Sequence, residues 1–244
     1  MITKNEIKFI RSLKIKKNRI KSNQFIVEGE KMVDELVESA IELVKIYSTS
    51  SKYEYLGDMY CSISKTNLSQ ISNLKTPNKV VAIFSIPKPS KINFSSQIIA
   101  LDNVSDPGNL GTIIRLCDWF GIKDLICSEE TVDCFNPKVV QASMGSISRV
   151  NISYIDFQKL FSDKKLKTVV ADLNGESIND FPFHKNQIIV FGNESIGVSK
   201  EIKKLVKDRV TIPRYNNNVD VESINVANSV AIILAELKNR STGK

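Results

Sequence analysis

Short, unbroken apolar runs recur through the second half of this 244-residue chain, for example at 98–101 (IIAL) and 188–191 (IIVF). Strands that are apolar on both sides are typical of a parallel sheet that is covered by helices on both faces. Segments with apolar residues at helical spacing separate these runs. The alternation therefore predicts an α/β domain built on a parallel sheet.

The same alternation begins earlier, so we predict two α/β regions. In the first region we expect helices at 4–15, 29–39 and 64–71 and strands at 24–28, 43–47 and 79–86. The polar stretch 14–23 (KIKKNRIKSN) is interpreted as a connection or an RNA-facing strip. In the second region we expect strands at 98–101, 124–127, 151–154, 168–172, 188–191 and 209–212, and helices at 109–120, 138–144, 156–162, 199–206 and 223–238.

The stretch between the two regions has the composition of a linker. Residues 87–96 (PKPSKINFSS) hold two prolines and three serines and show no apolar periodicity. We therefore predict one domain at 1–86 and a second at 97–244.

Positive charge is concentrated at the N-terminus. The formal net charge is +7, and residues 1–27 account for all of it, because the remainder carries 26 basic and 26 acidic residues. A basic arm on a neutral body favours nucleic-acid binding, with a solvated charged helix as the alternative. The candidate RNA-binding residues are Lys4, Lys8, Arg11, Lys14, Lys16, Lys17, Arg19 and Lys21.

Composition also disfavours several classes of function. No apolar run approaches the ~18 residues of a membrane helix, and the N-terminus lacks the apolar block of a signal peptide, so we expect a cytoplasmic protein without a membrane partner. The four cysteines show no CxxC spacing, which favours free thiols over a zinc site or disulfides. Because His184 is the only histidine, a histidine triad and a histidine-rich metal site are disfavoured, and we expect no metal.

The most informative stretch is 101–121 (LDNVSDPGNLGTIIRLCDWFG), a strand end, a polar turn and a helix. At ~100° per residue, Arg115 lies roughly 200° from Ile113 and points away from the core, over the carboxyl end of the strand. Ligands bind at that edge in open α/β sheets, where an Arg beside Asn and Asp indicates a phosphate or ribose contact. The structural alternative is an ion pair with Asp118. The turn has neither P-loop nor dinucleotide-binding spacing.

Two later stretches share this composition. Residues 190–202 (VFGNESIGVSKEI) end a strand with Glu194, which can accept hydrogen bonds from a substrate or serve as a helix N-terminal carboxylate. Residues 210–237 pass from a strand through an Asn-rich loop into a helix that Ser223 can cap. That helix is apolar nearly all the way round, which predicts burial on more than one side. It is either central to one core or packed against a second copy of the chain, and we favour the homodimer.

Taken together, these stretches resemble the SpoU (TrmH-type) branch of the SPOUT RNA methyltransferases. The matching motifs are 102–115 (DNVSDPGNLGTIIR), 141–146 (QASMGS), 191–198 (FGNESIGV), and 212–213 (IP) followed by 222–227 (ESINVA). Residues 5–85 are similar to the family's N-terminal substrate-binding domain, chiefly at 25–29 (FIVEG). The resemblance implies a C-terminal α/β knot with a deep trefoil knot, although chains are otherwise unknotted. It also implies an obligate homodimer and S-adenosyl-L-methionine as cofactor.

The reaction that the resemblance implies is methyl transfer to a ribose 2′-hydroxyl, a target that fits RNA. It implies cofactor contacts from Gly192, Ile212, Ile224 and Val226, and a catalytic site of Arg115, Asn109, Glu194, Ser223 and Asn225. Such a transfer needs an in-line approach and loss of the hydroxyl proton, but no metal. The family gives Arg115 a base-like role, yet a guanidinium keeps its proton below a pKa of ~12. Both roles, base and clamp, stay open.

The two-domain layout and the basic arm favour 23S ribosomal RNA as the substrate, with transfer RNA as the alternative. A second hypothesis is a non-catalytic RNA-binding or ribosome-assembly protein on the same scaffold, because the loop Arg214–Val221 lacks the family's glycine and is longer than its pattern. Base methylation on the same fold is a third, and the pair Asn109 and Arg115 disfavours it.

Overall fold

The computed structural model describes residues 2–163, 165–216 and 223–242, with side chains up to residue 240. The described chain forms two compact units. The first comprises Met1–Lys88 together with Asp133–Ser148, and the second comprises Pro89–Val132 and Arg149–Lys244. The first division falls at Lys88, inside the stretch predicted as a linker. The grouping of Asp133–Ser148 with the first unit differs from the predicted domains, which placed that segment in the second.

The first unit is built on a four-stranded mixed sheet. Its strands are β1 (Gln24–Glu28), β2 (Leu43–Ser48), β3 (Tyr60–Ser62) and β4 (Val80–Ser85). They lie in the order β1-β4-β2-β3, with β4 antiparallel to both β1 and β2 and with β3 parallel to β2. The three strands predicted here are confirmed. The fourth, β3, was missed because three residues are too few for a periodic pattern.

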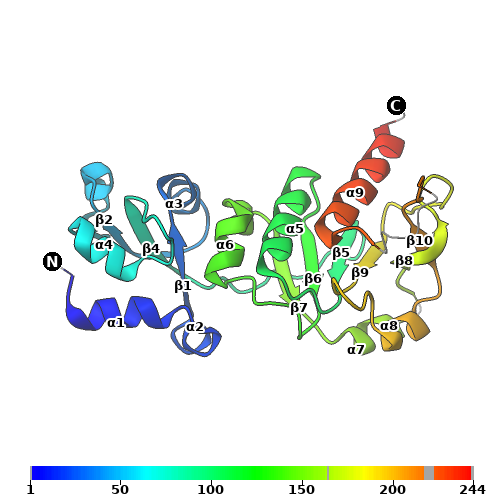
Figure 1. Ribbon diagram of the computed structural model, residues 1–244, viewed down its shortest axis with the longest axis horizontal. Helices are drawn as coiled ribbons and strands as arrows, with labels where there is room; N and C mark the ends of the chain where they lie inside the picture. The colour runs from blue at the N-terminus through cyan, green and yellow to red at the C-terminus, as the bar shows by residue number, and fades with distance from the viewer. Residues whose placement is uncertain (1, 164, 217–222, 243–244) are drawn as a thin grey trace. The chain divides into compact units, whose positions relative to one another are not determined.

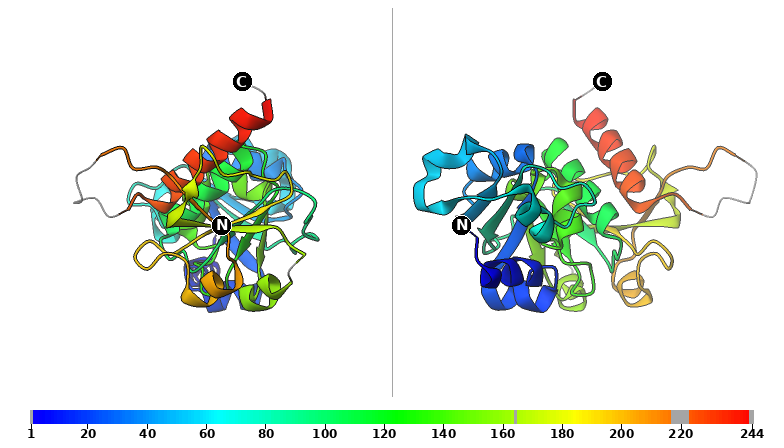
Figure 2. Two further views of the ribbon diagram at one scale, coloured as in Figure 1. Left: turned by 90° about the vertical axis from the view of Figure 1, so that its right-hand side faces the viewer. Right: turned by 60° about the vertical axis from the view of Figure 1, so that its left-hand side comes forward.

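Several helices of the first unit begin at side-chain caps. The helices of this unit are α1 (Lys4–Ser12), α2 (Lys16–Ser22), α3 (Glu30–Val37), the 3₁₀ segment η1 (Ser51–Met59), α4 (Lys65–Ile71), α6 (Pro137–Ser143) and the short η2 (Ser146–Ser148). Thr3 and Glu6 form a capping box at α1, and the predicted cap Ser64 accepts a hydrogen bond from the Asn67 amide. Of the two interpretations of residues 14–23, the connection was wrong, because α2 occupies most of the stretch, and the RNA-facing strip stays a prediction. Helices α1 and α2 are dark blue in Figure 2.

One residue of the basic arm lies in the interior. Arg19 is only 2 % exposed and pairs with Asp133, its Nε lying 3.0 Å from Oδ2. Its Nη1 also donates to the carbonyls of Leu13 and Lys14, at 2.8 and 2.9 Å. The prediction that Arg19 binds RNA was therefore wrong: its guanidinium fixes the Asp133 segment within the first unit. Charge along the sequence could not distinguish this residue from its neighbours.

The second unit is built on a six-stranded sheet in which every pair of neighbours is parallel, as predicted. The order is β10-β8-β9-β5-β6-β7. The strands are β5 (Ile98–Leu101), β6 (Asp124–Cys127), β7 (Asn151–Tyr154), β8 (Thr168–Ser177), β9 (Ile188–Phe191) and β10 (Arg209–Thr211). All six predicted strands are confirmed, four of them with identical bounds. Every residue of the two central strands β5 and β9 is buried.

Helices cover both faces of this sheet (Figure 1). On one face, α7 (Phe157–Ser162) and α8 (Lys200–Leu205) share a buried cluster with alternate strand residues such as Ile98 and Val190. On the other face lie α5 (Pro107–Trp119) and α9 (Val226–Thr242), which pack against each other. Because the strands are parallel, the loops after β5, β9 and β10 all lie at the carboxyl edge of the sheet.

The last helix starts later than predicted. Helix α9 begins at Val226, and the side chain of Asn225 accepts hydrogen bonds from the amides of Ala227 and Asn228, at 2.8 and 3.3 Å. Asn225 therefore caps the helix, and the prediction of Ser223 as the cap was wrong. Within one chain, α9 is buried at residues such as Val230, while Ile232 is 39 % exposed. In the residues described, no helix is long and apolar enough to cross a membrane.

Candidate functional site

Glu194 joins the first two polar loops of the carboxyl edge. Its Oε2 accepts from the amide and hydroxyl of Ser105, at 3.3 and 3.2 Å, and its Oε1 accepts from the Asp106 amide at 3.1 Å. These amides lie at the start of α5, where unpaired N–H groups and the helix dipole favour a carboxylate. Of the two roles considered for Glu194, the helix N-terminal one is present, but at α5 rather than at the helix that follows Glu194 in sequence.

Asn109 extends this connection to the third loop. Its Nδ2 donates to Glu194 Oε1 at 2.9 Å, and its Oδ1 accepts from Asn225 Nδ2 at 2.8 Å. Each amide is thereby oriented, because Nδ2 must face the carboxylate and Oδ1 must face the donor. Glu194, Asn109 and Asn225, all predicted as site residues, thus form one hydrogen-bonded chain across three loops. We call it the Glu194–Asn109–Asn225 chain.

The environment of Glu194 keeps its carboxylate charged. Partial burial raises the pKa of Glu194, but hydrogen bonds from the Asn109 side chain and from the backbone of Glu194, Asp106 and Ser105 outweigh it, so the pKa lies below the usual range. A carboxylate that accepts this many hydrogen bonds is a poor general base, because they stabilise the form without a proton. Glu194 therefore positions Asn109 and the start of α5.

The loop after β9 is a tight hairpin. The Asn193 amide donates to the Gly197 carbonyl at 3.1 Å, and the Gly197 amide donates back at 2.9 Å. A Cβ on Gly192 would lie 2.0 Å from the Val198 backbone nitrogen, so only glycine fits there. Gly192, to which the family resemblance gives a cofactor contact, thus also has a packing role that was not predicted.

Two further residues, missed from the sequence, hold the hairpin to the loop after β5. Buried Asp102 accepts from the Ser199 amide at 2.7 Å, and Asn193 Nδ2 donates to the Asn103 carbonyl at 2.8 Å. The only signal in the sequence is that each is polar and directly follows, or nearly follows, a buried strand.

Arg115 is exposed on α5. Its guanidinium has no hydrogen-bond or ion-pair partner among the residues described, and Asp118 pairs instead with Arg149 at 2.8 Å. The structural alternative for Arg115, an ion pair with Asp118, is thus not present. A charged side chain left unpaired in this way is available to bind an anion.

The remaining predicted residues lie near the start of α9 and the end of β10. Ser223 is exposed and makes no hydrogen bond within the described part of the chain, so the structure does not bring it into the Glu194–Asn109–Asn225 chain. Ile212 is half-buried, Ile224 is 46 % exposed and Val226 is buried. The loop Arg214–Val221, which was expected to affect cofactor binding, lies mostly outside the described residues.

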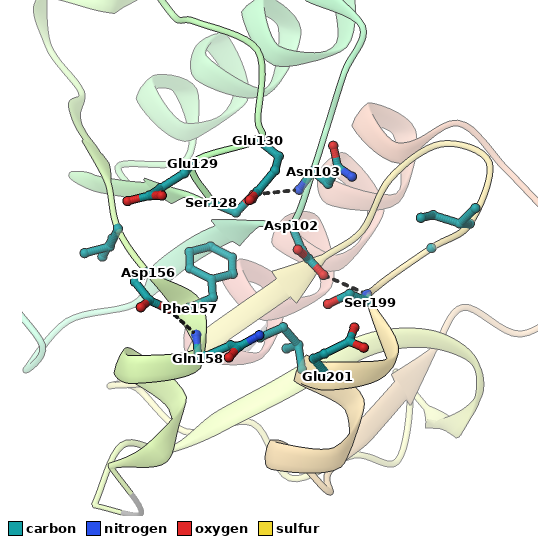
Figure 3. A pocket seen from close by; sticks show the side chains of 14 residues that line it. Asp102, Asn103, Ser128, Glu129, Glu130, Asp156, Phe157, Gln158, Ser199 and Glu201 are labelled. Carbon is teal, nitrogen blue, oxygen red and sulfur yellow. Dashed lines mark hydrogen bonds between the residues drawn. The ribbon is translucent and has the colours of Figure 1, made fainter.

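A cavity of about 440 Å³ opens beside these loops (Figure 3). Its lining includes the carboxylates of Asp102, Glu129, Glu130, Asp156 and Glu201, and none of the predicted cofactor residues. Figure 3 shows these side chains around the ends of the strands and the starts of α7 and α8. Such a concentration of negative charge repels phosphate groups, so this cavity does not suit RNA.

Metal and thiol chemistry find no support in the described residues. No group of three or more His, Cys, Asp or Glu residues is placed there to hold a metal ion. Cys117, Cys127 and Cys134 are buried, and burial raises the pKa of Cys117 well above its usual range.

Two family models match the chain. The SpoU rRNA Methylase family matches residues 96–235, and the MRM3-like substrate binding domain matches residues 4–82. The chain is 30 % identical to the 23S rRNA (guanosine(2553)-2'-O)-methyltransferase RlmP of Bacillus subtilis, with 96 % of each sequence aligned.

Solved structures agree over nearly the whole length. A TrmH-family protein of Porphyromonas gingivalis has a TM-score of 0.90 and 32 % identity, covering 98 % of this chain and 99 % of that one. An AdoMet-bound rRNA methyltransferase of Sinorhizobium meliloti has a TM-score of 0.87 and 26 % identity, covering 98 % and 96 %. The predicted SPOUT-type α/β fold is confirmed, and the chain belongs to the SpoU rRNA methylase family.

Proposed function

We propose that this protein transfers a methyl group from S-adenosylmethionine to a ribose 2′-hydroxyl of 23S ribosomal RNA. The relatives described above support the reaction and the substrate. The observation from the structure that carries the proposal is the Glu194–Asn109–Asn225 chain, which joins three loops of the carboxyl edge, with unpaired Arg115 on the helix that carries Asn109.

The residues proposed to hold the cofactor fit its chemistry. Ile212 and Ile224 keep apolar side-chain surface exposed at the carboxyl edge, which suits a ligand with an adenine ring and a methionine chain. Gly192 directly precedes the hairpin that Asn193 and Gly197 close, and Val226 is the first residue of α9. When bound, the cofactor supplies an electrophilic methyl group.

The protein's own residues bind and orient the ribose. Arg115 carries five N–H donors and no acceptor, so in this proposal it binds a neighbouring RNA phosphate and donates to the alkoxide that develops on the 2′-oxygen. This is the clamp role. The base-like role would require Arg115 to lose its proton, which a guanidinium with a pKa above ~12 resists near neutral pH. Asn109, held by its two hydrogen bonds, is fixed for contact with the ribose, and Ser223 adds a hydroxyl from the third loop.

Seven of the eight predicted RNA-binding residues stay candidates, because their side chains are exposed on and between α1 and α2. They are Lys4, Lys8, Arg11, Lys14, Lys16, Lys17 and Lys21. We call this set the basic face of the first unit. It supplies charge for phosphate contacts without base-specific contacts.

Neutralising part of the basic face is expected to weaken RNA binding and its dependence on salt. The triple variant Lys8→Gln, Arg11→Gln, Lys14→Gln removes three charges, and each lost phosphate contact lowers the slope of log K against log salt by about 0.7–0.9. We expect a slope smaller by about 2–3, measured by filter binding of 23S rRNA between about 50 and 200 mM salt. The matched control neutralises Lys123, Lys185 and Lys207, exposed lysines of the second unit. An equal loss in that control would place the RNA surface elsewhere.

The same proposal includes a homodimer, a trefoil knot in the second unit and a cytoplasmic location. The partly exposed Ile232 on an otherwise apolar α9 supports a dimer through this helix. A ribosomal substrate supports the location.

Three alternatives can be compared with this proposal. With transfer RNA as the substrate, the reaction would be the same. The large first unit with its basic face disfavours this substrate. A non-catalytic RNA-binding protein would have no need for the Glu194–Asn109–Asn225 chain beside an unpaired Arg115. Base methylation would need a different set of acid and base residues.

The deciding experiment is transfer of tritiated methyl groups from S-adenosylmethionine to total RNA that lacks the modification, followed by nuclease digestion and nucleoside mapping. We expect label on a ribose of 23S rRNA. Label in transfer RNA would contradict the proposal that 23S rRNA is the substrate. No label in any RNA, together with no cofactor binding by calorimetry, would favour the non-catalytic alternative.

A further inference from the structure

A second cavity, of about 260 Å³, lies within the first unit. It is lined by residues of β1, of the turn after α4, and of α6, the helix that packs against β1. We call it the β1–α6 pocket. We propose that this pocket binds one unpaired nucleobase of the substrate RNA. The inference rests on the proposed function, because it takes RNA to be the substrate.

The size and the walls of the pocket suit a single ring system. Its volume is below the roughly 300–1,000 Å³ of sites that hold drug-sized ligands. Ile26, Leu74 and Val140 supply apolar side chains to its lining, and Ile26 and Val140 are almost completely buried. RNA is read mainly through unpaired bases that leave the stack and insert between side chains. Apolar walls around a small volume provide such a place.

The polar groups of the pocket fit a nucleotide. Gln141 lines it, and its side-chain amide has no partner among the described residues. An amide presents a donor and an acceptor together, which matches the edge of a base. Lys138 is exposed at the same pocket and can bind the phosphate of that nucleotide. A hydrocarbon ligand or an apolar peptide side chain would use neither group.

Glu28, the last residue of β1, holds one wall of the pocket in place. Glu28 is only 5 % exposed. It accepts from the Ser72 hydroxyl and, through Oε1, from the amide and the side-chain Nδ2 of Asn73, both at 2.8 Å. The turn after α4 is thereby fixed against β1. The buried Oδ1 of Asn73, on the other side of the same amide, has no partner among the described residues.

The unit that contains the pocket suggests RNA as its ligand. Two walls of the pocket, β1 and the turn after α4, lie in the region 4–82 that matches a substrate binding domain. The third wall, α6, belongs to the same compact unit, which also carries the basic face. The basic face attracts any nucleic acid, because phosphate contacts carry no sequence information. A pocket for one base adds what the basic face lacks, a contact that depends on a particular unpaired nucleotide.

The test fills the pocket without removing a hydrogen bond. Ala142, half-buried in the lining, is changed to leucine, and Gln141→Ala is the second variant. Ser69→Leu, at an exposed position of α4, is the matched control. Steady-state methyl transfer to unmodified 23S rRNA gives KM for RNA, KM for S-adenosylmethionine and kcat. We expect KM for RNA to rise about tenfold, the lower part of the range for losing one bound base, with KM for S-adenosylmethionine and kcat unchanged. The control should match the wild type.

A second readout does not depend on catalysis. The full-length protein is irradiated with short-wave ultraviolet light on 23S rRNA, and peptides that carry a nucleotide are identified by mass spectrometry. We expect adducts in peptides that contain 73–74 or 137–142, and their loss in Ala142→Leu. If Ala142→Leu fails to fold, Gln141→Ala decides.

The outcomes separate this inference from the proposed function. An active wild type, with wild-type KM for RNA in both pocket variants and no adducts in those peptides, overturns the pocket alone. A wild type that transfers no methyl group to any RNA overturns the proposed function, and the adducts then decide whether the pocket contacts RNA.

Discussion

Arg115→Ala should lower kcat for methyl transfer by at least about 10²–10³-fold. That is the usual loss when one donor to a developing oxyanion is removed. In the proposed reaction the charge develops on the ribose 2′-oxygen, and Arg115 is the cation without a partner on the helix that carries Asn109. KM for S-adenosylmethionine should not change, because the residues assigned to the cofactor lie on other loops. Tritium transfer at saturating RNA, with the concentration of S-adenosylmethionine varied, measures both quantities.

Stability should hardly change in the same variant. Arg115 is exposed and has no polar partner in the described part of the chain, so the free energy of unfolding should stay within about 0.5 kcal/mol of the wild type. Arg115→Lys keeps the charge but loses the planar fork of donors, and we expect only slight recovery of kcat. Lys123→Ala, an exposed cation of the same unit, is the matched control. Activity retained by Arg115→Ala would remove Arg115 from the site.

The edge of the sheet that holds this site could be predicted because strand ends are easy to recognise. Apolar runs end abruptly at polar residues, and the carboxyl ends of parallel strands meet at one edge. The resemblance to the SpoU family named Asn109, Glu194 and Asn225 together, and they form one chain. The particular partners could not be predicted. Glu194 could as well have capped the helix that follows it, and only the packing of the loops puts it against the start of α5.

The errors share a physical cause, which is that sequence position does not reveal burial for a polar residue. Helix α2 has too few apolar residues to give a periodic signal. Arg19 looks like any other basic residue of the arm, although its guanidinium is buried. Ser223 and Asn225 are both good helix caps, and the choice between them depends on where α9 meets Asn109.

The second large effect is expected in the first unit, where Asp133→Ala should destabilise the fold by about 3–5 kcal/mol. Arg19 is 2 % exposed and Asp133 is 15 % exposed at their side chains. Removing the carboxylate leaves a buried guanidinium whose charge is no longer compensated, although the carbonyls of Leu13 and Lys14 still accept from it. The unpaired charge, rather than the lost contact, sets the magnitude.

A surface pair of the same chemistry serves as the control. Asp118→Ala breaks the ion pair between Asp118 and Arg149, whose side chains are 21 % and 45 % exposed, respectively. The free energy of unfolding should therefore fall by at most about 1 kcal/mol. Urea unfolding of the full-length protein, followed by hydrogen exchange of β1 amides, compares the two variants and locates the loss in the first unit. The double variant Arg19→Met, Asp133→Leu should recover most of the stability, because it leaves no buried charge. If Asp133→Ala cost no more than Asp118→Ala, Arg19 would not be the residue that fixes the Asp133–Ser148 segment. In that case the pair of Arg19 and Asp133 would place no structural constraint on the lysines of the basic face.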